Sequence, residues 1–334
     1  MKALITGGAG YIGSTVASAC QDEGIVPIIV DDLSTGRREF VFDREFFFGD
    51  VADPQLMGRI FAEHPDIFAV VHCAAKIVVP ESVAEPLLYY RNNLHGLTNI
   101  LQSMANHGCQ RFLFSSSASI YAPGADLSVD EKSPLAPTSP YARTKYMSEL
   151  ILADVAAASS LRSLSLRYFN PIGADPALRT GLQTAAPTHA LGKMIEAYQG
   201  QDSFKITGVD WPTRDGSGIR DYIHVWDLAR AHAAALHRFD TLFGDGVTSR
   251  SINIGTGSGT TVRELVAAFE RATGASLHAV EAPPRPGDAA GCYTRSELAF
   301  EALGWAPERS IEDGIRDSLA WARRRAEVLA DAYA

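Results

Sequence analysis

The sequence predicts an α/β fold, a doubly wound parallel sheet followed by a smaller mixed α/β C-terminal lobe. First, short apolar runs alternate with longer amphipathic stretches throughout the N-terminal half. Strands separated by helices of that length form βαβ units, whose parallel sheet is covered on both faces. Second, a glycine-rich turn follows the first apolar run directly. Third, the alternation breaks near residue 170, beyond which loop-forming Pro, Gly and Thr are frequent.

The expected elements follow from these patterns in chain order. Apolar runs bounded by turn residues predict strands, and apolar residues that recur every three or four positions predict helices. Pro27 counts against the prediction of the second strand, because proline donates no hydrogen bond to a ladder. We still expect a strand there, because a Glu-Gly turn precedes the run and two aspartates follow it. The expected strands are 2–6, 25–30, 45–48, 69–72, 111–115, 163–167, 204–207 and 251–254. The expected helices are 13–23, 54–63, 86–106, 140–158, 190–199, 225–239, 261–272 and 311–332.

The composition excludes several classes of function. The 334 residues suffice for one large or two linked domains. Because 39 acidic residues outnumber 30 basic ones, we expect neither a nucleic-acid nor a membrane-surface partner. No apolar run approaches the ~20 residues of a membrane helix, and the first run is too short for a signal peptide. The four cysteines are scattered, so we expect a cytoplasmic protein without a disulfide framework or a metal site.

The glycine-rich turn, TGGAGYIG at 6–13, has the pattern of a dinucleotide-binding loop. Its glycines permit a tight turn, a close approach of backbone to a pyrophosphate and close packing of the next helix, whose N-terminus offers free N–H groups. Such a turn also occurs without a ligand, but the strand, the helix and Asp31 about 20 residues on favour a dinucleotide. The carboxylate repels a 2′-phosphate and favours NAD, whereas Arg37 and Arg38 leave NADP open. The spaced glycines are Gly7, Gly10 and Gly13.

The motif therefore predicts a Rossmann-type NAD-binding domain over residues 1–170. Residues 171–334 are expected to form mainly the substrate-binding lobe. Since no flexible linker separates the two parts, we expect some of the later chain to return to the first domain.

A tyrosine and a lysine four residues apart, Tyr141 and Lys145, follow a proline that suits a helix start. This spacing puts both side chains on one face of a helix. A nearby ammonium favours the phenolate and could lower the pKa of the tyrosine by ~1–3 units, so that it takes a proton from an alcohol. Such pairs are frequent on protein surfaces, but a serine run at 115–119 ends a strand at the sheet edge where ligands bind. Ser117 would hydrogen-bond the same alcohol oxygen.

Together these features resemble the extended short-chain dehydrogenase/reductase family, and within it the branch that epimerises UDP-glucose and UDP-galactose at C4. The likeness runs nearly end to end, and RYFNP and RDYIHV are more specific than the glycine loop. The matching stretches are TGGAGYIGS at 6–14, DDLSTG at 31–36, GDV at 49–51, HCAA at 72–75, ESV and PLLYYRNN within 81–93, SSSASIY at 115–121, SPYARTK at 139–145, LRYFNPIGA at 166–174, DGSGIRDYIHVWDLA at 215–229, INIGTG at 252–257 and RPGD at 285–288.

The resemblance implies transient oxidation of a UDP-hexose to a 4-keto sugar by tightly held NAD, with the UDP held firmly while the hexose turns. It also implies a homodimer that pairs helices near 86–107 and 140–158. The implied catalytic residues are Tyr141, Lys145 and Ser117. The implied cofactor-binding residues are Gly7, Gly10, Tyr11, Ile12, Gly13, Asp31, Asp32, Leu33, Ser34, Thr35, Gly36, Asp50, Val51, Ala74, Ala75, Lys76, Asn92, Tyr141, Lys145 and Phe169. The implied substrate-binding residues are Ser117, Tyr141, Asn170, Arg220, Arg285, Asp288 and Cys292.

Departures from related enzymes narrow the expected reaction. Similar 4,6-dehydratases carry an Asp-Glu pair where this chain has Ala118 and Ser119, so we expect epimerisation without elimination. Cys292 falls where a bulky tyrosine restricts the pocket to plain hexoses, so a small residue there predicts that UDP-N-acetylhexosamines are accepted as well. A one-residue change of register would make Tyr293 the gate instead.

Two other functions remain open. A 4-epimerase of UDP-uronic acids or UDP-pentoses would share the same motifs. A non-catalytic NAD-binding sensor on the same fold would be expected to lose the tyrosine and lysine, which this chain keeps.

Overall fold

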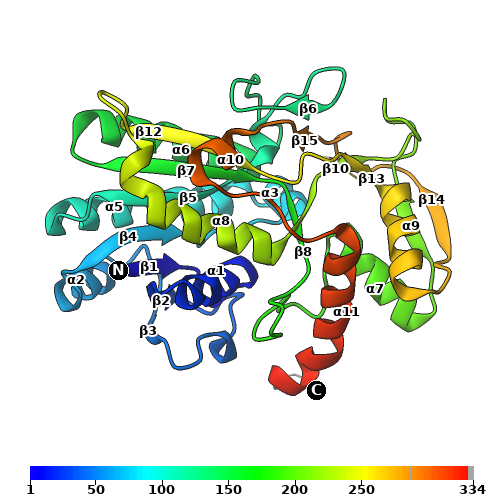
Figure 1. Ribbon diagram of the computed structural model, residues 1–334, viewed down its shortest axis with the longest axis horizontal. Helices are drawn as coiled ribbons and strands as arrows, with labels where there is room; N and C mark the ends of the chain where they lie inside the picture. Colours follow the sequence, from blue (N-terminus) through cyan, green and yellow to red (C-terminus); the bar gives the residue numbers. More distant parts are fainter. Residues whose placement is uncertain (286–287, 330–334) are drawn as a thin grey trace.

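The computed structural model describes residues 1–285 and 288–329 (Figure 1). Within them a seven-stranded sheet forms the centre, in the order β12-β7-β5-β4-β1-β2-β3, and every neighbouring pair is parallel. The predicted fold class is therefore confirmed. The strands are β1 (Lys2–Thr6), β2 (Val26–Asp31), β3 (Glu45–Phe48), β4 (Ile67–His72), β5 (Arg111–Ser117), β7 (Arg162–Tyr168) and β12 (Ser249–Ile254).

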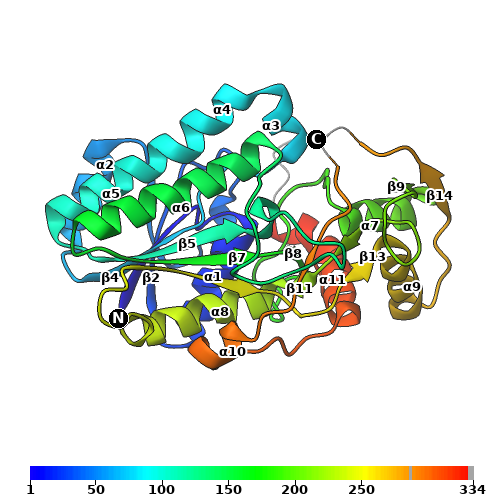
Figure 2. The same cartoon turned by 90° about the horizontal axis from the view of Figure 1, so that it is seen from above.

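Helices cover both faces of this sheet, as the view from above shows (Figure 2). α1 (Tyr11–Asp22) and α8 (Val225–Arg238) pack on one face. Successive strand residues point to opposite faces, so Ala3 and Ile5 join the core under α1 and α8 while Leu4 joins the other. The second face is covered by α2 (Pro54–Glu63), α5 (Gly96–His107) and α6 (Pro140–Ala158).

Pro27 lies inside β2, but it breaks no hydrogen bond with the outer strand. The pairing of β2 with β3 begins only at Ile28, which lies opposite Glu45. Pro27 is paired with Ala3 on the inner side. The missing N–H group is therefore tolerated because the neighbouring edge strand starts one residue later.

The C-terminal half returns to the main sheet through β12, which pairs with β7 from Ser249↔Ser163 to Ile254↔Tyr168. α8 packs against α1, and α10 (Leu298–Leu303) lies against β12 and α8. The two halves of the chain are thus interleaved (Figure 1).

The second lobe is built from small two-stranded sheets and three helices around its own core. Its short strands pair residues that are far apart in the sequence, and most of them were not predicted. The pairs are β8 (Asn170–Ile172) with β11 (Tyr222–His224), β9 (Phe204–Thr207) with β14 (Ala279–Ala282), β10 (Ile219–Arg220) with β13 (Thr260–Thr261), and β6 (Ser128–Val129) with β15 (Tyr293–Thr294). The helices are α7 (Ala190–Gly200), α9 (Val262–Thr273) and α11 (Ile311–Val328). Residues 330–332 of the expected last helix lie outside the described residues.

The helix expected at 86–106 is interrupted. α4 (Pro86–Tyr90) and α5 are joined by a π-helical turn, η2 (Arg91–His95), and an unpredicted helix, α3 (Val79–Ala84), precedes them. π-helical turns often occur at functional sites. Short 3-10 helices complete the fold: η1 (Arg38–Phe40), η3 (Ala118–Ile120) and η4 (Phe239–Leu242).

Candidate active site

The glycine-rich loop joins β1 to α1 at the carboxyl edge of the sheet. Gly7 has φ +67°, and a Cβ there would lie 2.7 Å from the backbone N of Ala74. A Cβ on Gly13 would strike the carbonyl oxygen of Gly7. Gly10 caps α1 without a side-chain hydrogen bond, and a Cβ there would meet only the Gly7 oxygen. The first N–H groups of α1, from Tyr11 onward, are therefore uncovered by any capping side chain.

Asp31 ties the end of β2 to this loop. Its Oδ2 accepts a hydrogen bond from Ala9 N at 3.0 Å and its Oδ1 accepts one from Leu33 N at 2.8 Å. Burial raises the pKa of this carboxyl, although both backbone bonds oppose the effect. Gly36 packs on the carboxylate, since a Cβ there would lie 2.7 Å from Oδ1.

The rest of the predicted cofactor loop is held by local bonds. Asp32 accepts hydrogen bonds from the backbone N and the hydroxyl of Ser34, and Thr35 beside it is exposed. Arg37 donates its backbone N–H to Ala9 O, and its buried Nε has no partner among the described residues. Asp50 accepts a bond from Ala52 N ahead of α2. Ile12 is half-buried and Val51 is buried.

An asparagine next to the predicted one anchors the segment after β4. Asn93 is buried, accepts a bond from Lys76 N at 2.9 Å, and donates to Lys76 O and to Thr144 Oγ1 of α6. The predicted Asn92 is exposed on the same π-helical turn, and Ala74 and Ala75 are half-buried. The sequence shows that two asparagines are adjacent, but it does not show which of them is buried. The π-helical turn determines that the side chain of Asn93 points inward.

Tyr141 and Lys145 occupy the start of α6, where Ser139 Oγ accepts a hydrogen bond from Ala142 N. Both side chains are buried, with exposed fractions of 8% and 3%. Lys145 Nζ donates to Ser115 O at 2.7 Å and lies 4.8 Å from the centre of the Phe114 ring. The end of β5 and the first turns of α6 therefore face each other.

Ser117 completes this group at the last position of β5. Its side chain lies next to the Tyr141 phenol and lowers the pKa of that group, and its hydroxyl donates to Ser119 Oγ at 3.0 Å and accepts from Ser119 N. Of the serine run, Ser117 is thus the residue that the structure brings to the tyrosine, while Ser119 makes the local bonds typical of a strand end.

The titration of the pair differs from the expectation. Burial raises the pKa of Tyr141, and the hydrogen bond from Ser117 opposes this effect. Burial also lowers the pKa of Lys145 to about 8, against the opposing influence of Cys73 and Glu149. The spacing predicts a lowered phenol pKa, but in the structure desolvation of the buried ring raises the pKa of Tyr141, and the Lys145 ammonium is bonded to Ser115 O.

The predicted substrate residues lie on the second lobe and its junction with the sheet. Asn170 begins β8 and donates its backbone N–H to Asp221 O, and Phe169 before it is buried. Arg220 Nη1 donates to Ala290 O at 2.8 Å, and Nη2 donates to Ala289 O at 3.2 Å.

Arg285 and Asp288 form a pair on the surface. Asp288 Oδ2 accepts from the backbone N of Arg285 at 3.0 Å and from its Nε at 3.3 Å. Pro286 and Gly287 of the RPGD motif lie outside the described residues.

Cys292 directly precedes β15, which begins at Tyr293, and the two side chains have different neighbours. The Cys292 side chain packs against the buried cluster that contains Ala118 and Phe169. Tyr293 lies against Gly259, where a Cβ would come within 2.5 Å of its ring. Of the two residues, Cys292 is therefore the one that lies beside the serine segment.

Two further residues organise the second lobe without having been predicted. Asp221 is fully buried and accepts hydrogen bonds from the backbone N–H groups of Thr256, Gly257 and Thr294, so it joins three segments around Arg220. His189 caps α7, because its Nδ1 accepts from Gly192 N at 3.2 Å. The Asp221 bonds join residues 35 to 73 positions apart, so no local pattern indicates them, whereas the His189 cap spans only three residues.

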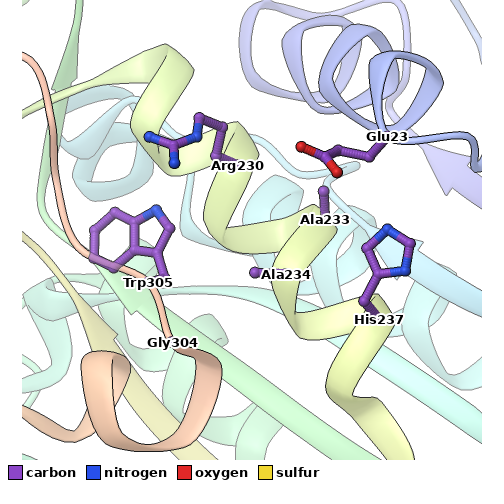
Figure 3. A pocket seen from close by; sticks show the side chains of 7 residues that line it. All are labelled: Glu23, Arg230, Ala233, Ala234, His237, Gly304 and Trp305. Atoms are coloured by element: carbon purple, nitrogen blue, oxygen red, sulfur yellow. The ribbon is translucent and has the colours of Figure 1, made fainter.

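A hollow on the far part of the molecule is a separate feature (Figure 3). It lies between Glu23, at the end of α1, and the α8 side chains Arg230 and His237. α1 has 12 residues, so at ~1.5 Å per residue this wall is about 18 Å from Gly10. Arg230 is already paired with Glu308 at 2.6 Å. The predicted residues gather at the carboxyl edge instead.

The parallel sheet, the glycine loop and the buried tyrosine, lysine and serine at one edge define a dinucleotide-binding enzyme of the α/β class. The chain belongs to the NAD dependent epimerase/dehydratase family, whose model matches residues 3–255. This membership confirms the predicted family and its NAD dependence. No helix among residues 1–285 and 288–329 is long and apolar enough to span a membrane.

Individual relatives match nearly the whole chain. The UDP-glucose 4-epimerase of Azospirillum brasilense is 42% identical over 325 residues, which cover 96% of this chain and 92% of the relative. A crystal structure of UDP-glucose 4-epimerase from Stenotrophomonas maltophila, with bound NAD and formylated UDP-arabinopyranose, superposes with a TM-score of 0.92 at 36% identity, covering 98% and 99% of the two chains. The UDP-Glc/GlcNAc 4-epimerase of Campylobacter jejuni gives 0.82 at 34% identity, covering 97% and 99%.

Proposed function

We propose that this chain interconverts UDP-glucose and UDP-galactose by epimerising the hexose at C4, with tightly held NAD. The observation that carries the proposal is the meeting of Tyr141, Ser117 and Lys145 at the carboxyl edge, two strands from the glycine loop. The names of the relatives support the same reaction.

The residues around the glycine loop fit NAD. The uncapped N–H groups of α1 suit a pyrophosphate, and the glycine at position 10 places no side chain beside them. The Asp31 carboxylate suits the adenosine ribose. When bound, NAD supplies reversible oxidation of the sugar at C4 and a positively charged ring. Residues 31–36, 50–51 and 74–76, with Asn92, Lys145 and Phe169, are the positions that we propose to complete its site.

Tyr141 is proposed to take the proton from the sugar O4 on its phenol oxygen and to return it after the sugar has turned. Because burial raises the pKa of Tyr141, the phenolate needs a cation nearby, and the Lys145 ammonium is one helical turn away. Ser117 donates to or accepts from the same oxygen and keeps it in line. Ala118 and Ser119 carry no carboxyl group, which supports epimerisation without elimination.

The UDP group must be held firmly while only the hexose turns. We assign this role to Asn170, Arg220, Arg285 and Asp288. The arginines suit a diphosphate because the planar guanidinium donates to two oxygens at once. Arg220 now donates to two backbone carbonyls of residues 289–290, so its donors already converge on the segment that leads to Cys292.

We further propose that UDP-N-acetylglucosamine and UDP-N-acetylgalactosamine are substrates. Cys292 lies beside Ala118 and Phe169, where a tyrosine ring would fill space next to the serine segment. A relative that acts on both UDP-Glc and UDP-GlcNAc supports this wider pocket.

A homodimer is proposed on the evidence of an exposed apolar surface. α3 and α4 contact α6, and the three helices lie side by side (Figure 2). Several large apolar side chains of these helices are exposed. Leu87 is 75% exposed. Such a patch is typical of a protein–protein interface. The exposed residues are Val83, Leu87, Leu88, Met147 and Leu150. A cytoplasmic location is proposed because all four cysteines are free thiols.

The reaction is tested by incubating the purified protein, without added cofactor, with UDP-galactose and following the sugar by NMR. Formation of UDP-glucose is expected, with Tyr141→Phe as the inactive control. A UDP-pentose is tested in parallel, since one structural relative holds formylated UDP-arabinopyranose. If only the UDP-pentose is converted, the substrate is a UDP-pentose and not a UDP-hexose. If neither compound is converted, even with NAD supplied, a non-catalytic NAD sensor is favoured.

A further inference from the structure

We propose that Glu149 is the positioning residue of this active site: it fixes β5 against α6 and so sets Ser117 and Lys145 relative to Tyr141. The inference rests on the proposed function for the roles of those three residues. It follows from a buried carboxylate on the catalytic helix that the reaction itself does not use.

Glu149 follows Lys145 by four residues and Tyr141 by eight on α6. Residues at this spacing lie on one face of a helix. The three side chains therefore make successive contacts with the end of β5. Tyr141 bonds to the Ser117 hydroxyl, Lys145 to the Ser115 carbonyl, and Glu149 to the Ser116 hydroxyl at 2.6 Å.

The Glu149 carboxylate is held from the opposite side by Arg167. Arg167 Nε donates to Oε1 at 2.9 Å and Nη2 donates to Oε2 at 2.6 Å, with side chains only 7% and 10% exposed. Ser116 and Arg167 are direct neighbours in the β5–β7 ladder. Two adjacent strands thus present their donors to one carboxylate, which leaves it little freedom to move.

The same arginine reaches the segment after Ser117. Arg167 Nη1 donates to the Tyr121 hydroxyl at 2.9 Å, and that hydroxyl donates to Asn253 Oδ1 at 2.7 Å. Asn253 is the neighbour of Arg167 on β12. The turn over residues 118–120 is therefore fixed at its far end as well, so Ser117 is constrained from both sides.

Glu149 also places a carboxylate near the Lys145 ammonium. The other titratable groups around this ammonium are His72 and Cys73 at the end of β4 and Tyr141 on α6. The charge of Glu149 raises the pKa of Lys145 against the effect of burial. Removing the charge should therefore lower the pKa of Lys145 further, whereas a purely structural bond would leave it unchanged.

The test is Glu149→Gln, which keeps the shape of the side chain and removes its charge. The chain has six lysines, at positions 2, 76, 132, 145, 193 and 205, so lysine labelled with 13C at Cε gives few NMR signals. Lys145→Arg assigns the signal of Lys145. In the wild type this signal should titrate near pH 8, and in Glu149→Gln at a measurably lower pH. We also expect kcat to fall at least tenfold, with KM for UDP-galactose within about threefold.

Asp227→Asn is the matched control. Asp227 is a fully buried acid on α8 that pairs with Arg230 and accepts from the backbone of Glu308 and Arg309, away from β5. Its loss should destabilise the fold in urea while the titration of Lys145 and kcat stay as in the wild type. Equal kcat losses in both variants, or an unchanged Lys145 titration in Glu149→Gln, would overturn the proposal.

Ser116→Ala keeps the test decisive if Glu149→Gln does not fold. It removes one hydrogen bond and leaves the ion pair with Arg167. A several-fold fall in kcat at unchanged KM is expected, and a wild-type kcat would overturn the proposal. The NMR titration needs no turnover, so failure of the proposed epimerase function would remain distinguishable from failure of this inference.

Discussion

Replacing Lys145 by methionine removes a buried charge while keeping the length of the side chain. Burial lowers the pKa of Lys145 from 10.5 to about 8, a difference of about 2.5 pH units. At 1.36 kcal/mol per pH unit, the charged form destabilises the folded state by about 3 kcal/mol. Loss of the hydrogen bond from the charged ammonium to Ser115 O offsets about 1.5 kcal/mol of this. We therefore expect Lys145→Met to raise the free energy of unfolding at pH 7 by about 1.5 kcal/mol while abolishing epimerisation.

The pH dependence follows from the sign of the pKa change. Below about pH 8 Lys145 is protonated in both the folded and the unfolded state, so the full penalty of the buried charge is present. Between about pH 8 and 10.5 the unfolded state binds more protons than the folded state, so the wild type gains stability as the pH rises. The variant lacks this gain, and its advantage should disappear by about pH 10.

Urea unfolding followed by tryptophan fluorescence at pH 7, 8, 9 and 10 measures both effects. Lys205→Met, at an exposed lysine of β9, is the matched control for loss of a lysine charge at the surface. A Lys145→Met protein that is less stable than the wild type at pH 7 would refute the reasoning. So would a stability difference that is constant from pH 7 to 10.

Four other predictions test the site and the assembly. Tyr141→Phe should lower kcat by roughly 10²- to 10⁴-fold with UDP binding by calorimetry intact, since only proton transfer is lost; weaker UDP binding of the same size would contradict this role. Cys292→Tyr should abolish turnover of UDP-N-acetylgalactosamine and leave turnover of UDP-galactose unchanged, as measured by NMR. Equal activity on both sugars would show that residue 292 does not control access of N-acetylated sugars. Arg220→Lys should raise KM for UDP-galactose roughly tenfold or more, because an ammonium replaces the planar guanidinium and its paired donors. An unchanged KM would show that Arg220 does not bind the diphosphate. Leu87→Glu should give a monomer in sedimentation, and a persisting dimer would move the interface elsewhere.

The sheet and its cofactor loop were predictable because their signals are local. The spacing of Gly7, Gly10 and Gly13 marks a tight turn, and the structure places Gly7 and Gly13 where a Cβ would strike backbone atoms. The four-residue spacing of Tyr141 and Lys145 likewise survives in α6, since a regular helix preserves it.

The remaining features depend on contacts that the local sequence does not encode. β8 and β11 are each three residues long and lie about 50 residues apart, so their pairing needs the folded lobe. Asn93, rather than its neighbour, points inward because of a π-helical turn. Burial raises the pKa of Tyr141, opposite to the direction that the spacing predicts, because desolvation is set by tertiary packing, which a spacing of four residues does not reveal.

The position of β12 at the edge of the sheet has a consequence for synthesis on the ribosome. β7 ends at Tyr168, and its partner begins only at Ser249, about 80 residues later. At roughly 5–20 residues per second, the outer edge of β7 stays unpaired for about 4–16 s. An open edge strand invites pairing with other chains. The nascent chain therefore passes through an interval in which aggregation competes with folding. The interval ends only when residues 249–254 have been synthesised and pair with β7, and Glu131 Oε1 then accepts a hydrogen bond from Asn253 N.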